Sequence, residues 1–234
     1  MGKIGVFDSG IGGLTVLDEL YEVLPKEDFI FYADSIHNPY GEKSDEELYQ
    51  ITSDIVEYLI ERDCHIIVIA CNTATTRCIQ YLREHFPEVV FIGTEPAVKV
   101  ACDGNYKNTL VMATPATIQS ERLQLLIHDN QKENNHFYLA PCYGLANAIE
   151  DGDTKKQNEI IYNLYEEYKE NNIDSIVLGC THYPHISELI SSYFKDAVLL
   201  DGAMGVARET KRQMELHNLI TNQGTGNVEI IKTK

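Results

Sequence analysis

The chain has 234 residues, and its 36 acidic and 19 basic side chains give a formal net charge of -17. This charge argues against nucleic acid or an anionic membrane as a partner, and no apolar run approaches the roughly eighteen residues that a membrane-spanning helix needs. The six cysteines include no C-x-x-C pair, and the sequence shows no secretory leader. We therefore expect a reduced cytoplasmic protein with free thiols.

The first half of the sequence alternates short apolar runs with amphipathic segments, which is typical of an α/β fold. The turn Asp8–Gly13 follows the first apolar run and leads into a helix that Pro25 ends. Asp8 is either a helix cap or a functional carboxylate, and the glycines after it permit close approach of a ligand. Ser44 and Glu47 are expected to form a capping box. The strands expected here are 3–7, 28–32, 66–70 and 89–93, and the helices are 14–24, 44–62, 72–85 and 95–102.

The same alternation restarts in the second half. Thr114–Thr117 is expected to be a turn, 130–135 a polar loop, and the tail from Gln223 a hairpin or a terminal strand. The last helix is amphipathic enough to pack back on the first half. The strands expected here are 109–113, 137–140, 175–179 and 198–200, and the helices are 118–128, 155–171, 184–194 and 204–217.

One stretch occurs twice. Residues 66–73 recur in altered form as 175–182, and each is a β-branched apolar run that stops at a small residue followed by a cysteine, Cys71 or Cys180. Ligands of open α/β sheets bind outside the carboxyl ends of the strands, so both thiols stand where chemistry is expected. The repeat predicts two pseudo-symmetric, doubly wound domains with parallel sheets and an interdomain active-site cleft to which each half contributes one thiol.

A pair of facing thiols has three interpretations. The pKa of a free thiol is about 8.5, and a helix N-terminus lowers it, so two thiols from symmetric halves can act as a base and an acid that invert a carbon centre. Alternatively both are small buried hydrophobic residues, which is what we expect of Cys64, Cys78 and Cys102. The third interpretation is a zinc site with Cys71, Cys180 and His182 as ligands.

Four motifs, in chain order, resemble the cofactor-independent aspartate/glutamate racemase family: Asp8–Gly10, Pro39–Gly41, Ala70–Ala74 and Gly179–Pro184. The resemblance extends from Ile4 to about Thr210. It implies a second α/β domain, 95–203, inserted into a first one made of 1–94 plus 204–234, with glutamate bound between them. It also implies racemisation without pyridoxal phosphate, metal or nucleotide, a product used for bacterial peptidoglycan, and a homodimer.

The same resemblance implies roles for individual residues. Cys71 would act on the D-enantiomer and Cys180 on the L-enantiomer. Asp8 and His182 would assist the two thiols, and Glu150 would orient His182. The residues that would hold the substrate are Ser9, Pro39, Tyr40, Gly41, Asn72, Thr73, Thr114, Thr117 and Thr181. Blander alternatives are a surface role for His182 and ordinary turn positions for Thr114 and Thr117.

Three segments depart from the family's usual pattern: Ser35–Asn38, Pro141–Ile149 and Asp201–Ala203. They are expected to line the far end of the pocket, so they bear on selectivity for the substrate's side chain. Rival hypotheses are therefore a racemase for aspartate or another acidic amino acid, and a catalytically silent binding or regulatory protein. A nucleotide site at the Gly10–Gly13 turn is a further alternative.

Overall fold

A computed structural model of the chain describes residues 2–221 and 224–233. The chain divides into two compact units, one made of Met1–Thr94 with Ala203–Lys234 and the other of Glu95–Gly202. Ala203 lies in the first unit, one residue before the expected boundary, because it begins α10 (Ala203–Leu216) and packs in that unit's core. Gln223, with which the predicted tail begins, lies outside the described residues.

The first unit contains a five-stranded parallel sheet in the order β4-β3-β1-β2-β9. Its strands are β1 (Lys3–Asp8), β2 (Phe29–Ala33), β3 (Cys64–Ile69), β4 (Val90–Gly93) and β9 (Val228–Lys232). The chain runs from β1 to β2 on one side and then crosses to β3 on the other. This reversal is the topological switch point of a doubly wound sheet, and it lies between the carboxyl ends of β1 and β3.

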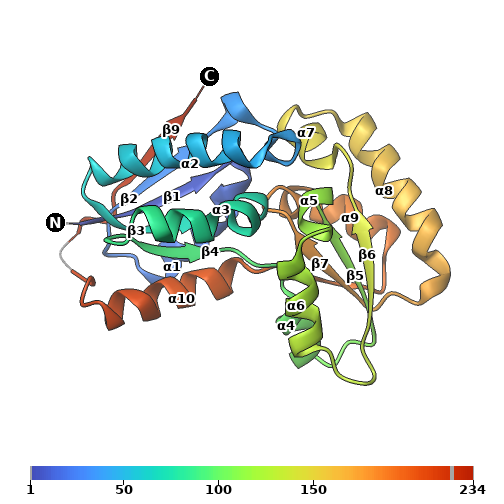
Figure 1. Cartoon of the computed structure of the whole chain (residues 1–234). Helices are drawn as coiled ribbons and strands as arrows, with labels where there is room; N and C mark the ends of the chain where they lie inside the picture. The colour runs from blue at the N-terminus through green and yellow to red at the C-terminus, as the bar shows by residue number, and fades with distance from the viewer. Residues whose placement is uncertain (1, 222–223, 234) are drawn as a thin grey trace. The chain divides into compact units, whose positions relative to one another are not determined.

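Helices cover both faces of this sheet (Figure 1). Helices α1 (Leu14–Val23) and α10 pack on one face, and α2 (Asp45–Ile60) and α3 (Asn72–His85) pack on the other. Successive strand residues point to opposite faces, so Val6 is buried with the first pair of helices and Phe7 with the second. Burial on both faces explains why β1, β2, β3 and β4 are largely apolar runs rather than alternating ones, whereas the edge strand β9 is more exposed and more polar.

The second unit repeats this plan on a smaller scale. Its four-stranded parallel sheet has the order β6-β5-β7-β8, so its switch point lies between β5 and β7. The strands are β5 (Asn108–Ala113), β6 (His136–Pro141), β7 (Ser175–Gly179) and β8 (Val198–Leu200). Helices α4 (Val98–Asp103) and α6 (Glu121–Asn130) cover one face; α7 (Leu145–Glu150), α8 (Thr154–Tyr168) and α9 (Ser187–Tyr193) cover the other.

These observations confirm the predicted α/β class with parallel sheets. Several local predictions need correction. Thr114–Thr117 is not a simple turn, because Thr114 caps the short helix α5 (Pro115–Ile118). Helix α7 was not predicted, and the predicted helix 184–194 begins as a 3-10 turn, η5 (Tyr183–Ile186). For the tail, the second of the two predicted alternatives is confirmed, because β9 is a terminal strand that pairs in parallel with β2.

The capping box is confirmed: Ser44 Oγ accepts the Glu47 N–H at 3.2 Å, and Glu47 Oε2 accepts the Ser44 N–H at 2.8 Å.

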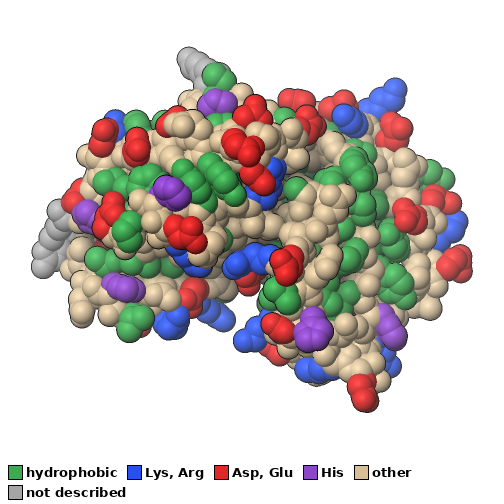
Figure 2. Space-filling model, viewed as in Figure 1, with side chains coloured by type: hydrophobic (Ala, Val, Ile, Leu, Met, Phe, Trp, Pro, Cys, Tyr) green, Lys and Arg blue, Asp and Glu red, His purple; other side chains and the backbone are tan. Residues whose placement is uncertain are grey.

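Within 2–221 and 224–233, no helix has the length and apolar character needed to cross a membrane. Figure 2 shows acidic side chains spread over the visible face of each unit rather than gathered in one area.

Candidate active site

The first half-site lies at the switch point of the first unit. Asp8 ends β1, and Cys71 follows β3 at the start of α3. The two strands are paired in parallel with Phe7 beside Ile69, and the Ala70 N–H donates to the Phe7 carbonyl at 2.9 Å. Adjacent parallel strands therefore deliver the carboxylate and the thiol to the same edge of the sheet.

Cys71 is the N-cap residue of α3. Its Sγ accepts the Ala74 N–H at 3.5 Å, and its thiol is oriented to donate to Ser9 Oγ at 3.6 Å. The side chain is nearly buried, with 6% of its surface exposed. A backbone N–H and the positive end of the helix dipole both favour the anionic form of a sulfur atom, so this position is suited to a thiolate.

Asp8 is fully buried, and its Oδ1 accepts the Gly10 N–H at 2.9 Å. The glycine turn packs directly on it: a Cβ at Gly13 would lie 2.6 Å from Asp8 Cβ and 2.9 Å from Phe31. No side chain fits there, because real Cβ contacts are never so short. Close packing thus accounts for Gly13 without a nucleotide.

The second half-site is a chain of three side chains at the switch point of the second unit. Cys180 follows β7 and is 7% exposed, and its Sγ lies 3.8 Å from His182 Nδ1. His182 Nε2 lies 2.8 Å from Glu150 Oε2, and the His182 side chain is only 2% exposed. A histidine between a thiol and a carboxylate is the arrangement that activates cysteine in many enzymes.

The hydrogen bond to Glu150 fixes the chemistry of the ring. When Glu150 is ionised its carboxylate only accepts hydrogen bonds, and Nε2 is then the ring nitrogen that carries the proton and donates to it. The neutral ring then presents Nδ1 to Cys180 as an acceptor for the thiol proton. If the proton moves, an imidazolium donates from Nδ1 to a thiolate, and Glu150 stabilises the positive ring.

Glu150 reaches this position through α7. The helix begins after Gly144, whose φ of 68° is in the left-handed region that favours glycine. Its residues Leu145, Ala148 and Ile149 are buried, and Glu150 is its last residue. The i, i+4 spacing of Leu145 and Ile149 is the sequence signal that identifies such a helix, but Pro141 and Gly144 mask it with loop character.

The candidate substrate residues are divided between the units. Ser9, Asn72 and Thr73 lie beside Cys71 in the first unit, and Thr181 follows Cys180 in the second; all four are buried. Asn72 Oδ1 is a buried acceptor that lacks a hydrogen-bond partner among the described residues. Thr114 and Thr117 pair with each other, Oγ1 to Oγ1 at 3.0 Å, while Thr114 caps α5.

The Pro39–Gly41 loop lies close to the first half-site. Tyr40 is buried in the same cluster as Cys71, and its hydroxyl donates to Asp34 Oδ2 at 2.7 Å. Burial raises the pKa of the Tyr40 hydroxyl well above its ordinary value, and the charges of Asp34, Cys71 and Asp8 add to the effect. Tyr40 therefore stays protonated. Gly41 is exposed, with open space where a Cβ would stand, so its backbone is accessible.

Asp34, which lies outside the motifs recognised in the sequence, is 1% exposed and follows β2. It carries the same signal as Asp8, a carboxylate at the end of a buried strand. Besides Tyr40, it contacts His37 Nδ1 at 2.9 Å. His37 lies in the atypical Ser35–Asn38 segment, which forms the 3-10 turn η2 (Ser35–His37).

The other four cysteines are more deeply buried than Cys71 and Cys180. All six are free and buried. Burial raises the pKa of Cys64 to about 12, of Cys78 to about 11 and of Cys142 to about 12. These three are therefore neutral thiols at every physiological pH and belong to the core, as expected for Cys64 and Cys78.

Alkylation tests this difference. Iodoacetamide reacts with thiolates, so native protein at about pH 8 should be modified at Cys71 or Cys180 before Cys64, Cys78 or Cys142. Peptide mass spectrometry over time measures the order, and unfolding in urea should abolish it. Modification of Cys64 or Cys142 as fast as Cys71 would contradict the assignment of these thiols to the core.

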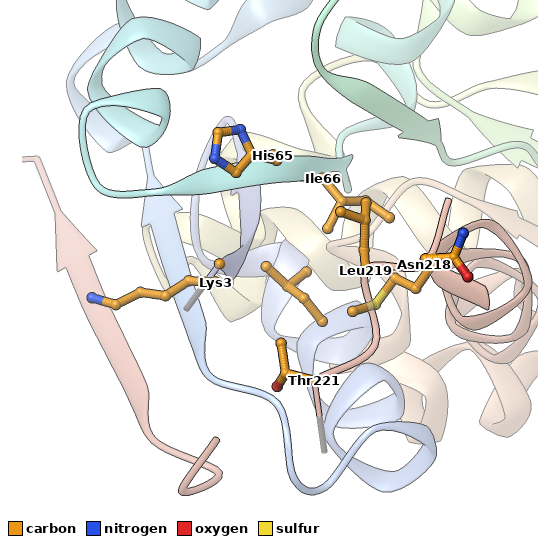
Figure 3. A pocket seen from close by; sticks show the side chains of 9 residues that line it. Lys3, His65, Ile66, Asn218, Leu219 and Thr221 are labelled. Atoms are coloured by element: carbon orange, nitrogen blue, oxygen red, sulfur yellow. The ribbon is translucent and has the colours of Figure 1, made fainter. Parts of the chain in front are cut away.

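A cavity of about 170 Å³ lies at the opposite end of the first unit's sheet, beside the amino ends of β1 and β3. Apolar side chains form much of its lining, namely Ile4, Ile66, Met214 and Leu219. In Figure 3 Lys3 points away from Ile66 and Leu219 toward β9, where its Nζ lies 3.7 Å from Glu229. Because ligands of parallel sheets bind at the carboxyl ends, this cavity is not the reaction site.

Among the described residues, no three His, Cys, Asp or Glu side chains cluster as metal ligands.

Comparison with known sequences gives a consistent result. The profile of the family Asp/Glu/Hydantoin racemase matches residues 16–209. Glutamate racemase of Clostridium perfringens is 40% identical over 237 residues, a match that covers 98% of this chain and 90% of that protein.

Two solved structures share the fold. Glutamate racemase of Francisella tularensis, in complex with D-glutamate, has a TM-score of 0.84 and 30% identity, and the match covers 100% of this chain and 88% of that one. Glutamate racemase of Escherichia coli, in complex with L-glutamate and the activator UDP-MurNAc-Ala, has a TM-score of 0.78 and 25% identity, with 99% of each chain covered.

Proposed function

The chain belongs to the Asp/Glu/hydantoin racemase family and is an amino-acid racemase, and from this premise we propose that it interconverts L-glutamate and D-glutamate. The observation that carries the proposal is the matched pair of half-sites. In each unit a cysteine follows the strand beside the switch point, and a carboxylate, Asp8 or Glu150, belongs to the same half-site. Inversion of a carbon centre needs a base and an acid, and two thiols supply both.

In the direction from L to D, the Cys180 thiolate removes the α-proton and the Cys71 thiol donates a proton to the opposite face of the carbon. Cys180 ends as a thiol and Cys71 as a thiolate, so the enzyme is ready for the reverse reaction. His182 is placed to take the proton of Cys180 and so to form its thiolate. Asp8 has the corresponding assisting role at Cys71. Positioned acids and bases of this kind contribute about a hundredfold to ten-thousandfold in rate.

Substrate binding must suit an acidic protein. Glutamate brings two carboxylates, and a chain with a net charge of -17 repels them at long range. Local donors are therefore needed, and the buried hydroxyls of Ser9, Thr73 and Thr181 beside strand-to-helix turns fit this need. The Tyr40 hydroxyl already donates a hydrogen bond to Asp34. We therefore propose that Pro39, Tyr40 and Gly41 contribute to substrate binding through the backbone of their loop.

Asn72 is proposed to bind the substrate's ammonium group, because its buried Oδ1 is an acceptor without a partner in the described structure. A hydrogen bond to a charged group contributes about 1.5–3 kcal/mol, so Asn72→Ala should raise KM for both enantiomers about tenfold or more. Initial rates followed by circular dichroism measure this. Ser53→Ala is the matched control, since Ser53 Oγ is also buried and has no hydrogen-bond partner among the described residues but lies on α2; it should leave KM unchanged.

The test of the function itself is a substrate panel. Purified protein in deuterated buffer should exchange the α-hydrogen of glutamate and racemise it, in the presence of a chelator and without added pyridoxal phosphate. Faster turnover of aspartate would favour the rival acidic substrate. Absence of exchange with every amino acid would favour a silent regulatory protein.

We further propose that the enzyme is a cytoplasmic homodimer whose product supplies peptidoglycan. Light scattering tests the dimer, and the dependence of a deletion strain on added D-glutamate tests the role in peptidoglycan.

A further inference from the structure

A single arginine ties the Pro39–Gly41 loop to the helix that carries Cys71. Arg77 Nη1 donates to the Lys43 carbonyl at 2.8 Å and to the Tyr40 carbonyl at 3.4 Å. Its Nε donates to Asp45 Oδ1 at 2.7 Å. We infer that Arg77 is a positioning residue that holds this loop in place for substrate binding, an inference that rests on the proposed function.

The position of Arg77 in the fold gives it this role. It lies on α3, less than two turns after the N-cap Cys71. Its side chain is mostly buried, with 19% of its surface exposed, and it spans from α3 to the segment that runs from η3 (Tyr40–Glu42) into α2. The same rigid helix therefore fixes both the thiol and the backbone of the loop.

The loop is held from a second side by Asp34. Tyr40 takes part in both attachments, because its hydroxyl donates to Asp34 and its carbonyl accepts from Arg77. Asp34 follows β2, the neighbour of β1, so the loop is fixed between the strand end next to Asp8 and the helix of Cys71. Gly41, which follows Tyr40 in this loop, is exposed and has open space where a Cβ would stand.

The chemistry calls for arginine rather than lysine. A guanidinium has five N–H donors in one plane, and Arg77 uses them on two backbone carbonyls and one carboxylate. A lysine ammonium at this position has a single nitrogen and does not reach all three acceptors. The two carbonyls belong to Tyr40 in the loop and to Lys43, the residue that precedes the α2 capping box. Loss of the hydrogen bonds from Arg77 to these carbonyls therefore frees the loop and leaves the thiol of Cys71 in place.

The expected result is a rise in KM without a matching loss of kcat. Arg77→Ala should raise KM for L- and D-glutamate about tenfold, as expected for a lost charged hydrogen bond at a binding loop, with kcat within about twofold of wild type. Arg77→Lys should give an intermediate KM. Arg83→Ala is the matched control: Arg83 is on the same helix and donates to a backbone carbonyl, that of Phe91 on β4, and its loss should leave KM unchanged.

Amide hydrogen exchange provides a readout that does not depend on activity. In Arg77→Ala the amides of residues 40–44 should exchange faster than in wild type, while those of β1 and β3 should not change. Wild-type KM in Arg77→Ala, or a raised KM with unchanged loop exchange, would overturn the inference. If the wild-type protein racemises no glutamate, the proposed function fails. Hydrogen exchange then still tests the attachment by Arg77: faster exchange of the loop in Arg77→Ala would support it, and unchanged exchange would overturn it.

Discussion

Replacement of either Cys71 or Cys180 by alanine should strongly reduce the rate at which glutamate is racemised while leaving each variant able to exchange the α-hydrogen of one enantiomer. In Cys71→Ala the remaining thiol, Cys180, removes the α-proton of L-glutamate and can only return a deuteron to the same face. L-glutamate should then become deuterated without inversion, and D-glutamate should stay unlabelled. Cys180→Ala should show the opposite selectivity. Loss of a positioned acid or base predicts a fall in racemisation of about a hundredfold to ten-thousandfold.

Proton NMR of the α-position, read beside circular dichroism, separates exchange from inversion in this experiment. Cys78→Ala and Cys102→Ala are the matched controls, one in each unit. Cys78 lies on α3, the helix that Cys71 caps, and Cys102 is the residue before the last in α4 of the second unit. Both are buried thiols whose pKa is raised by burial. The controls should racemise at the wild-type rate. Wild-type turnover in both active-site variants would exclude the two-thiol mechanism.

The second large effect is expected at His182 and Glu150. His182→Ala removes the acceptor that lies 3.8 Å from Cys180 Sγ, and kcat/KM should fall about a hundredfold or more. Glu150→Gln keeps the shape of the side chain but loses its charge, so the His182 tautomer is no longer fixed and the imidazolium is less stable. A fall of about tenfold to a hundredfold is expected for such an outer partner.

A pH profile makes this prediction specific. Loss of a neighbouring carboxylate lowers the pKa of a histidine, so in Glu150→Gln the pH dependence of kcat for L-glutamate should move to lower pH. Because the two enantiomers have equal free energy, kcat/KM must fall by the same factor for L-glutamate and for D-glutamate. Any difference between the two directions in Glu150→Gln therefore appears in kcat and in KM taken separately. Glu166→Gln, which removes an exposed partner of Lys169, is the control. An unchanged profile in Glu150→Gln would show that the carboxylate does not act through His182.

Sequence patterns alone predict strands β1 to β8, the cysteines that follow two of them, and the α/β class of the fold. A strand buried on both faces is a continuous apolar run, and β7 was predicted from such a run with the bounds that the structure has. The partly exposed edge strand β8 was also predicted with its observed bounds. A cysteine directly after such a run is fixed at the carboxyl edge of the sheet, where parallel strands place their ligands. These conclusions need only neighbours in sequence, because burial and the strand period act locally.

Only the tertiary structure decided which side chains meet. Glu150 and His182 are joined across 32 positions of sequence, and Arg77 and Tyr40 across 37. No local period records such pairs, because they depend on how the helices pack on the sheet. The same reason explains β9, whose pairing with β2 joins opposite ends of the chain, and Asp34, whose partners lie on a loop without regular periodicity.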